Sequence, residues 1–139
     1  MSLVAEIMAR LSSQSVGSTS STAAWRLVAR ELLPATIGGS TQAQMIAVIP
    51  TGGFQQEATE PLLRPTFQVQ VRGSSTGSTG LEAKVDAVRD ALNLWSSTGI
   101  LGRRMVDCQM QGDVLWLERD ENDNPIYGLN FVAFRSRTT

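Results

Sequence analysis

The sequence predicts a single α+β domain, in which a mainly antiparallel sheet has helices packed on one face. Three observations lead to this expectation. The chain has 139 residues, which fits one ordinary domain spanning residues 1–139. Residues 64–73, RPTFQVQVRG, alternate apolar and polar side chains as a half-buried strand does. Residues 81–95 form an apolar stripe at helical spacing, which a helix lying on a sheet would bury.

The N-terminal part is expected to start with an amphipathic helix over residues 2–13. Its apolar side chains recur at helical spacing. They are Leu3, Val4, Ile7, Met8 and Leu11. Glu6 and Arg10 interrupt the apolar positions, unlike the h-region of a signal peptide, and no run in the chain reaches the ~20 apolar residues of a membrane span. We expect a soluble protein, with residues 12–22, rich in Ser and Thr, forming a flexible loop.

Residues 25–34, WRLVARELLP, fit both a helix and an alternating strand. Because Ala, Leu, Arg and Glu dominate the segment, we favour the helix, which Pro34 would end. Residues 44–49, QMIAVI, predict a short strand closed by Pro50 and by the Gly52-Gly53 pair.

The alternation in residues 64–73 assigns a core face and a second face to that strand. Phe67, Val69 and Val71 form the first, and Gln68, Gln70 and Arg72 form the second. The second face is polar without being charged throughout, so we expect it to meet solvent or a partner. Residues 73–80, GSSTGSTG, predict a flexible loop. The loop lacks the Gly-Lys-Ser/Thr end of a phosphate-binding loop, so we do not expect nucleotide binding.

The next helix is expected to run from about Gly80 to Ser96, with Gly99 as its C-terminal cap. Thr79 and Glu82 have the spacing of a capping box. The apolar stripe consists of Leu81, Val85, Val88, Leu92 and Trp95.

The C-terminal part predicts an antiparallel hairpin. Residues 105–110 and 114–118 are extended, with a bulge or turn at Gly112-Asp113. Residues 120–125, DENDNP, read as a turn rather than a calcium loop, because the alternating ligands and central glycine of an EF-hand are missing. Residues 126–135 are apolar on both faces, which is typical of a central strand.

Composition narrows the possible functions. The chain has no histidine and one cysteine, so it lacks the usual general base and the soft ligands of a zinc site. We expect no enzyme activity, no metal and no cofactor, with Cys108 as a buried strand residue. The net charge of −1 does not favour tight nucleic-acid binding. All cations except Lys84 are arginine, which suits protein interfaces, although codon bias could also produce this composition.

The segment RPTFQVQVRG, the loop after it and LEAKVDAVRDAL together resemble the small tail-terminator (minor capsid, tail-completion) proteins of tailed bacteriophages. The preceding IPTGG, the opening helix and the closing NFVAF strand after an acidic turn are similar as well. The resemblance covers most of the chain in the order of its elements.

The resemblance implies a structural protein of the virion tail or neck, made in the host cytoplasm. Such proteins form a ring, commonly a hexamer, that ends tail-tube growth and docks the head connector or adaptor proteins. DNA would pass through the lumen without specific binding, and no membrane is involved. The residues that we expect at contacts come from the strand, its loop, a basic pair and a loop-bordering tryptophan. They are Trp25, Arg64, Gln68, Gln70, Arg72, Ser74, Ser75, Thr76, Arg103 and Arg104.

Other functions stay open at this point. A head-completion or connector adaptor of the phage neck would have a similar role on the other side of the joint. An enzyme could use paired carboxylates such as Asp107 and Asp113, and a binding module could take a small ligand. Trp95 continues the helix stripe and is assigned to the core, whereas Trp116 could also anchor an interface.

Overall fold

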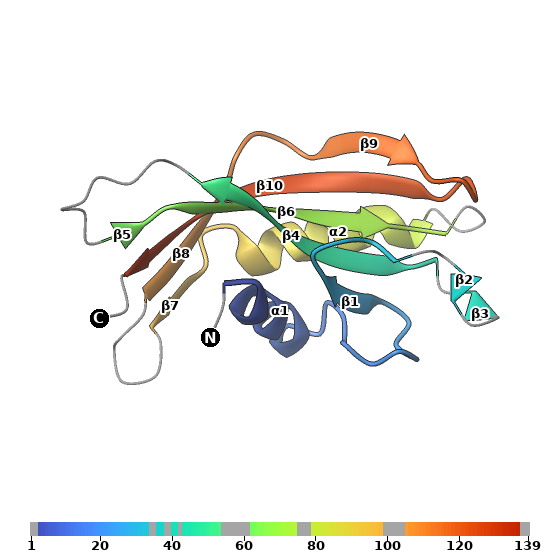
Figure 1. Cartoon of the computed structure of the whole chain (residues 1–139), viewed down its shortest axis with the longest axis horizontal. Helices are drawn as coiled ribbons and strands as arrows, with labels where there is room; N and C mark the ends of the chain where they lie inside the picture. Colours follow the sequence, from blue (N-terminus) through green and yellow to red (C-terminus); the bar gives the residue numbers. More distant parts are fainter. Residues whose placement is uncertain are drawn as a thin grey trace.

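The computed structural model describes residues 3–33, 36–37, 40–41, 43–53, 62–74, 79–98 and 105–136. Within these ranges, helices α1 (Leu3–Ser13) and α2 (Thr79–Leu92) lie on the same face of one sheet (Figure 1). The sheet is antiparallel except where β1 pairs with β4. The predicted α+β class is therefore confirmed. Among the described residues, no helix is long and apolar enough to cross a membrane.

The strands have the following bounds. They are β1 (Arg26–Ala29), β2 (Thr36–Ile37), β3 (Ser40–Thr41), β4 (Met45–Gly53), β5 (Leu62–Leu63), β6 (Pro65–Arg72), β7 (Ser96–Thr98), β8 (Met105–Met110), β9 (Leu115–Arg119) and β10 (Pro125–Ser136). The main sheet runs in the order β1-β4-β6-β10-β8-β7, and β2 and β3 form a separate pair.

Strand β10 is central, as its two apolar faces predicted. Strand β6 pairs with β10 from Ile126 to Val132, with Phe67 opposite Phe131. Strands β8 and β9 pair with other stretches of β10, around Ala133 and Tyr127 respectively. Because β6 occupies one edge of β10, β8 and β9 lie end to end along the other edge. The turn that joins them contains Gly112, whose φ of 74° is the left-handed conformation that glycine adopts readily.

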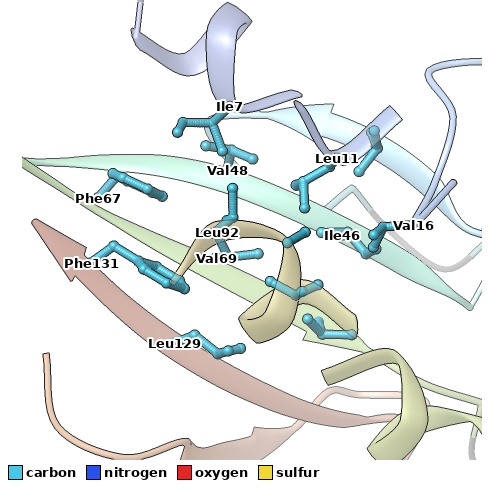
Figure 2. Packing of buried hydrophobic residues seen from close by; sticks show 14 of the residues in the cluster. Ile7, Leu11, Val16, Ile46, Val48, Phe67, Val69, Leu92, Leu129 and Phe131 are labelled. Carbon is cyan, nitrogen blue, oxygen red and sulfur yellow. The ribbon is translucent and has the colours of Figure 1, made fainter. Parts of the chain in front are cut away.

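The core lies between the sheet and the two helices (Figure 2). The α2 stripe is buried as predicted through Leu81, Val85, Val88 and Leu92. On the sheet, the rings of Phe67 and Phe131 stack with centroids 5.2 Å apart and planes 12° apart. These side chains come from three elements that are far apart in the sequence, α2, β6 and β10, so the core joins distant parts of the chain.

Helix α1 is fixed to its neighbours by charged side chains as well as by Ile7 and Leu11, which are buried. Arg10 Nε donates a hydrogen bond of 2.9 Å to the carbonyl of Ala91 in α2. Glu6 forms an ion pair of 3.1 Å with Arg135 of β10. The N-terminal helix is thus attached to the last strand.

The predicted helix over residues 25–34 is wrong, because residues 26–29 form β1. Leu27 and Val28 are both buried, on opposite faces of the sheet: Leu27 joins the main core, and Val28 packs with Met45 and Ala47. A strand buries two consecutive apolar residues in this way, and the pairing with β4 outweighs the helix propensity of the segment. Arg30 follows with a φ of 78°, and its N–H donates to the Val48 carbonyl.

Helix α2 ends at Leu92, four residues before the predicted end. Leu94 has a φ of 60°, and its N–H donates to the carbonyl of Cys108 (2.8 Å), while the Cys108 N–H donates to the Trp95 carbonyl (2.9 Å). These bonds direct the chain into β7 in place of another helical turn. The predicted cap, Gly99, lies outside the described residues.

The Ser/Thr-rich segment at residues 12–22 is organised rather than purely a flexible loop. The Val16 N–H donates to the Leu11 carbonyl, and Ser18 bridges to β1 through the Trp25 carbonyl and the Leu27 N–H. Val16 is buried in the core. The segment therefore closes the sheet beside α1.

The predicted strand ended at Ile49, before Pro50, whereas β4 continues past Pro50 to Gly53. The register to β6 shifts between Pro50 and Gly52, so a bulge absorbs the proline. Gly53 lies so close to β6 that an added Cβ would be 2.7 Å from the Arg64 carbonyl oxygen. Only glycine fits this approach without a shift of the backbone.

Candidate assembly surface

The sheet face opposite the helices has a ladder of amide side chains. Gln70 Nε2 donates to Gln68 Oε1 over 2.8 Å, and Gln68 Nε2 donates to Asn130 Oδ1 over 3.1 Å. Gln68 and Asn130 are direct cross-strand partners, so the ladder passes from β6 to β10. All three side chains are half-buried and uncharged. Such a surface can offer hydrogen bonds to another protein without the cost of desolvating a charge.

Leu117 of β9 covers the sheet beside this ladder. An added Cβ on Gly128 would lie 3.0 Å from Leu117 Cδ1 and 3.2 Å from Gln68 Nε2. The bare glycine therefore admits both side chains. The register shift between Ile126 and Tyr127 gives β9 the extra residue that this placement uses. Contact of Gln68 and Gln70 with a partner stays a prediction.

Arg72 lies on the same sheet face but is only 3% exposed. Its Nε donates to the Ala43 carbonyl (2.8 Å), its Nη1 donates to the Leu33 carbonyl (2.7 Å), and Nη1 lies 3.7 Å from Asp120 Oδ2. Burial lowers the pKa of the guanidinium, and the Asp120 carboxylate partly offsets this. The structure thus gives Arg72 an intrachain role in addition to the predicted contact role, which remains untested.

Asp120 organises the β9–β10 turn. Its Oδ1 accepts hydrogen bonds from the N–H groups of Asn122 (2.9 Å) and Asn124 (2.8 Å), and Oδ2 accepts from Asn124 Nδ2 (3.1 Å). Burial raises the pKa of the Asp120 carboxyl, but the bonds from Asn124 and Asn122 and the charge of Arg72 together lower it below its ordinary value. The segment is a hairpin turn, as predicted.

Asp120 in this turn should make the free energy of unfolding depend on pH in the acidic range. Since the pKa of Asp120 is lower in the folded chain than in the unfolded chain, its ionised form stabilises the fold above the ordinary aspartate range, about pH 4, and this contribution is lost as the pH falls further. We expect the unfolding free energy, measured by urea denaturation, to fall less between pH 7 and pH 3 in Asp120→Asn than in the original chain. Equal losses in both proteins would show that Asp120 does not contribute.

The remaining predicted contact residues are spread over the molecule. Trp25 is half-buried against the core, with Lys84 Nζ 5.3 Å from its ring centroid. Arg64, between β5 and β6, and Ser74, at the end of β6, are half-buried. The other four, Ser75, Thr76, Arg103 and Arg104, lie outside the described residues.

Large exposed apolar side chains mark a surface of which the sequence analysis singled out Trp116 alone. Leu115 and Trp116 of β9 are 45% and 56% exposed, and Leu94 is 76% exposed. Strand β9 pairs with β10 alone among the described strands, so its outer edge is unpaired. The signal in the sequence was the run VLWLE, whose apolar residues exceed what one buried face needs. We name Leu115, Trp116 and Glu118 the β9 edge.

Leu94 combines exposure with an unfavourable backbone conformation. At its φ of 60°, the Cβ of an L-residue lies too close to the following carbonyl oxygen, which costs roughly 1–2 kcal/mol. We expect Leu94→Asn to raise the unfolding free energy by about 1 kcal/mol, because asparagine tolerates this conformation. Leu115→Asn is the matched control, since Leu115 is exposed and not among the residues with positive φ. A gain in the control as large as in Leu94→Asn would contradict the role of strain.

The groups considered for catalysis do not form a site in the described part of the chain. Asp107 is in β8 and Asp113 is in the turn after it, where its Oδ1 accepts from the Val114 N–H (2.7 Å). No cluster of three or more His, Cys, Asp or Glu side chains suited to a metal occurs among the described residues. Cys108 is buried, and burial together with Asp107 and Glu6 raises the pKa of its thiol to about 12. This fits the structural role that was predicted for it.

An amide-lined sheet face and, among the described strands, an unpaired edge with exposed apolar side chains are typical of proteins that act through contacts with other proteins. The sequence model of the family described as Bacteriophage tail terminator protein matches residues 7–135. The chain belongs to this family, and it is a structural protein of the phage virion tail. No curated protein matches the sequence.

Proposed function

We propose that the protein is a subunit of a closed ring, formed by six copies, that sits on the end of the tail tube. The ring stops addition of further tube subunits and presents its opposite side to the head connector or adaptor proteins. The family match across residues 7–135 is the observation that supports this proposal most strongly. Synthesis in the host cytoplasm, before tail assembly, belongs to the same proposal.

A ring needs two different complementary surfaces on each subunit, because heterologous contacts close only after a full rotation. The chain offers a polar sheet face with Gln68, Gln70 and Asn130, and separate sheet edges at β1 and β9. These surfaces can serve different neighbours at the same time. The amide ladder suits a contact with the tube or the connector, because it supplies directional hydrogen bonds.

DNA must pass through the lumen of such a ring without being held there. Nucleic-acid binding gains most of its affinity from arrays of cations that neutralise phosphates. The chain has twelve basic and thirteen acidic residues, for a net charge of −1. This balance favours passage over retention.

The length of tail tubes tests the proposed termination. Purified tube protein from the same phage would be polymerised with and without this chain, and tube lengths would be measured by electron microscopy. We expect the chain to shorten the tubes and to be present at one end of each. Tubes of unchanged length without bound chain would contradict the proposal, and an unrelated protein of similar mass serves as the control.

A further inference from the structure

We propose that the β9 edge of one copy docks against the β1 edge of a second copy, with Trp116 as the central apolar contact. The β1 edge is defined here as Trp25, Ala29 and Arg30. The inference deepens the proposed ring and rests on it, because it assigns the two surfaces that would join neighbouring subunits.

The β9 edge has the properties of a surface that is covered in an assembly. An unpaired edge strand invites association with another chain, and monomeric proteins protect such edges with Lys, Pro or a covering segment. At this edge Leu115 and Trp116 are 45% and 56% exposed instead. Tryptophan is enriched among the residues that dominate binding energy at interfaces. Trp116 is therefore positioned to supply most of the energy of a contact.

The β1 edge is the other end of the same sheet. Strand β1 pairs with β4 on one side, and within the described ranges Ser18 bonds the first part of the other side, at the Trp25 carbonyl and the Leu27 N–H. Ala29 and Arg30 beyond that point are exposed. Trp25 is half-buried at the opposite end of β1, with Lys84 Nζ 5.3 Å from its ring centroid. In the proposed contact, the second copy would lie along β1 between this ring and Arg30.

The two edges are placed as a ring requires. Strands β4, β6 and β10 separate β1 from β9, and Figure 1 shows β9 and β1 on opposite sides of the molecule. A contact between the β9 edge of one copy and the β1 edge of another leaves the β1 edge of the first copy and the β9 edge of the second available for further copies. Each contact is thus heterologous, and repetition can continue until the ring closes.

Charge complementarity favours a second copy as the occupant. On the β9 side, Glu118 is exposed, and the nearby exposed Asp113 and Glu121 add negative charge. Arg119, the cation in this region, forms an ion pair of 3.8 Å with Asp123 of its own turn. On the β1 side, Arg30 is exposed, its backbone N–H donates to the Val48 carbonyl, and the next residue, Glu31, is exposed as well. The proposed contact places Glu118 of one copy opposite Arg30 of the other, because such a pair of opposite charges promotes one pairing over others.

The test is a charge exchange combined with removal of the aromatic anchor. Self-association of the full chain would be measured by analytical ultracentrifugation for Trp116→Asp, Glu118→Arg, Arg30→Glu and the Glu118→Arg/Arg30→Glu pair. We expect Trp116→Asp to weaken association at least thirtyfold, since central tryptophans commonly have effects of this size. We expect each charge reversal to weaken association and the pair to restore it.

Specificity and folding need their own controls. Asp86 and Arg89 form an exposed ion pair on α2, outside both edges, so Asp86→Arg should not restore the association lost in Arg30→Glu. Circular dichroism and thermal unfolding check that each variant folds, and Trp116→Gln replaces Trp116→Asp if the latter does not.

Each outcome decides between distinct alternatives. Oligomers that persist in Trp116→Asp, or a Glu118→Arg defect that Arg30→Glu does not restore, would overturn the docking of these edges while leaving the ring proposal in place. Intact oligomers that no longer bind tube protein would assign the β9 edge to the tube and would also overturn the inference. A monomeric original chain that does not join tails would instead overturn the ring itself.

Discussion

Replacement of Arg72 by alanine is expected to lower the unfolding free energy by about 3–5 kcal/mol, because two carbonyl acceptors lose their donor and a buried side chain is removed. The variant would deprive the Ala43 and Leu33 carbonyls of their donors and Asp120 of its cation. It would also leave a cavity where the side chain now lies. Urea denaturation with a structural probe measures the loss.

Arg72→Lys is the informative control. Lysine keeps the charge but cannot reproduce the forked geometry that reaches two carbonyls and a carboxylate at once. We expect a loss of stability between that of the original chain and that of Arg72→Ala. If Arg72→Ala were as stable as the original chain, the buried role of Arg72 would be wrong, and the predicted role in contact between subunits would gain weight.

Replacement of Phe67 by alanine should have an effect of similar size. Phe67 is fully buried, and its ring stacks on Phe131 at 5.2 Å (Figure 2). Truncation of a buried phenylalanine costs about 3–5 kcal/mol, because apolar contact is lost and a cavity remains. Since whole domains are stable by only about 5–15 kcal/mol, the variant is expected to be largely destabilised. Chemical denaturation at neutral pH tests this.

A double-mutant cycle separates the stacking from the burial. Phe67→Leu, Phe131→Leu and the double variant should show a coupling of about 0.5–1.5 kcal/mol between the rings. Gln68→Ala, one position along β6 on the other face, should cost about 1 kcal/mol or less, in line with loss of a partly solvated hydrogen bond. Additive effects in the cycle would show that the rings contribute only through burial.

Much of the fold could be predicted because the local periodicity of the sequence indicates several of its helices and strands. The four-three spacing of the α2 stripe, the alternation of β6 and the apolar faces of β10 each need only a short window of sequence. Strand β1 could not be predicted in this way. Its conformation depends on pairing with β4, which starts at Met45. It also depends on the burial of Val28 on the sheet face opposite the main core, which a short window of sequence does not reveal.

The candidate surface was predicted only in part, for a related reason. Alternation placed Gln68, Gln70 and Arg72 on one face correctly. It could not show that Asn130 lies opposite Gln68, because cross-strand register depends on long-range pairing. Nor could it show that Arg72 is covered by residue 33 and the Asp120 turn. Contacts by Ser75, Thr76, Arg103 and Arg104 remain predictions.

The end of α2 shows a limit of a different kind. A leucine at φ 60° contradicts ordinary conformational preference, and Leu94 adopts it because the backbone bonds between Leu94, Trp95 and Cys108 fix the turn. No sequence pattern marks such a residue in advance. Leu94 and Trp116 are both large apolar side chains, and both are exposed at the surface of this structural protein.

Native mass spectrometry of the purified full chain tests the central claim, which is assembly into a closed ring, most directly. The account predicts one dominant species with six times the 15.0 kDa mass of the chain, without a ladder of larger forms. Such a species is the one expected when heterologous contacts close into a ring. A chain that stays at 15.0 kDa at all concentrations, and that never appears as rings in tail preparations, would contradict the account.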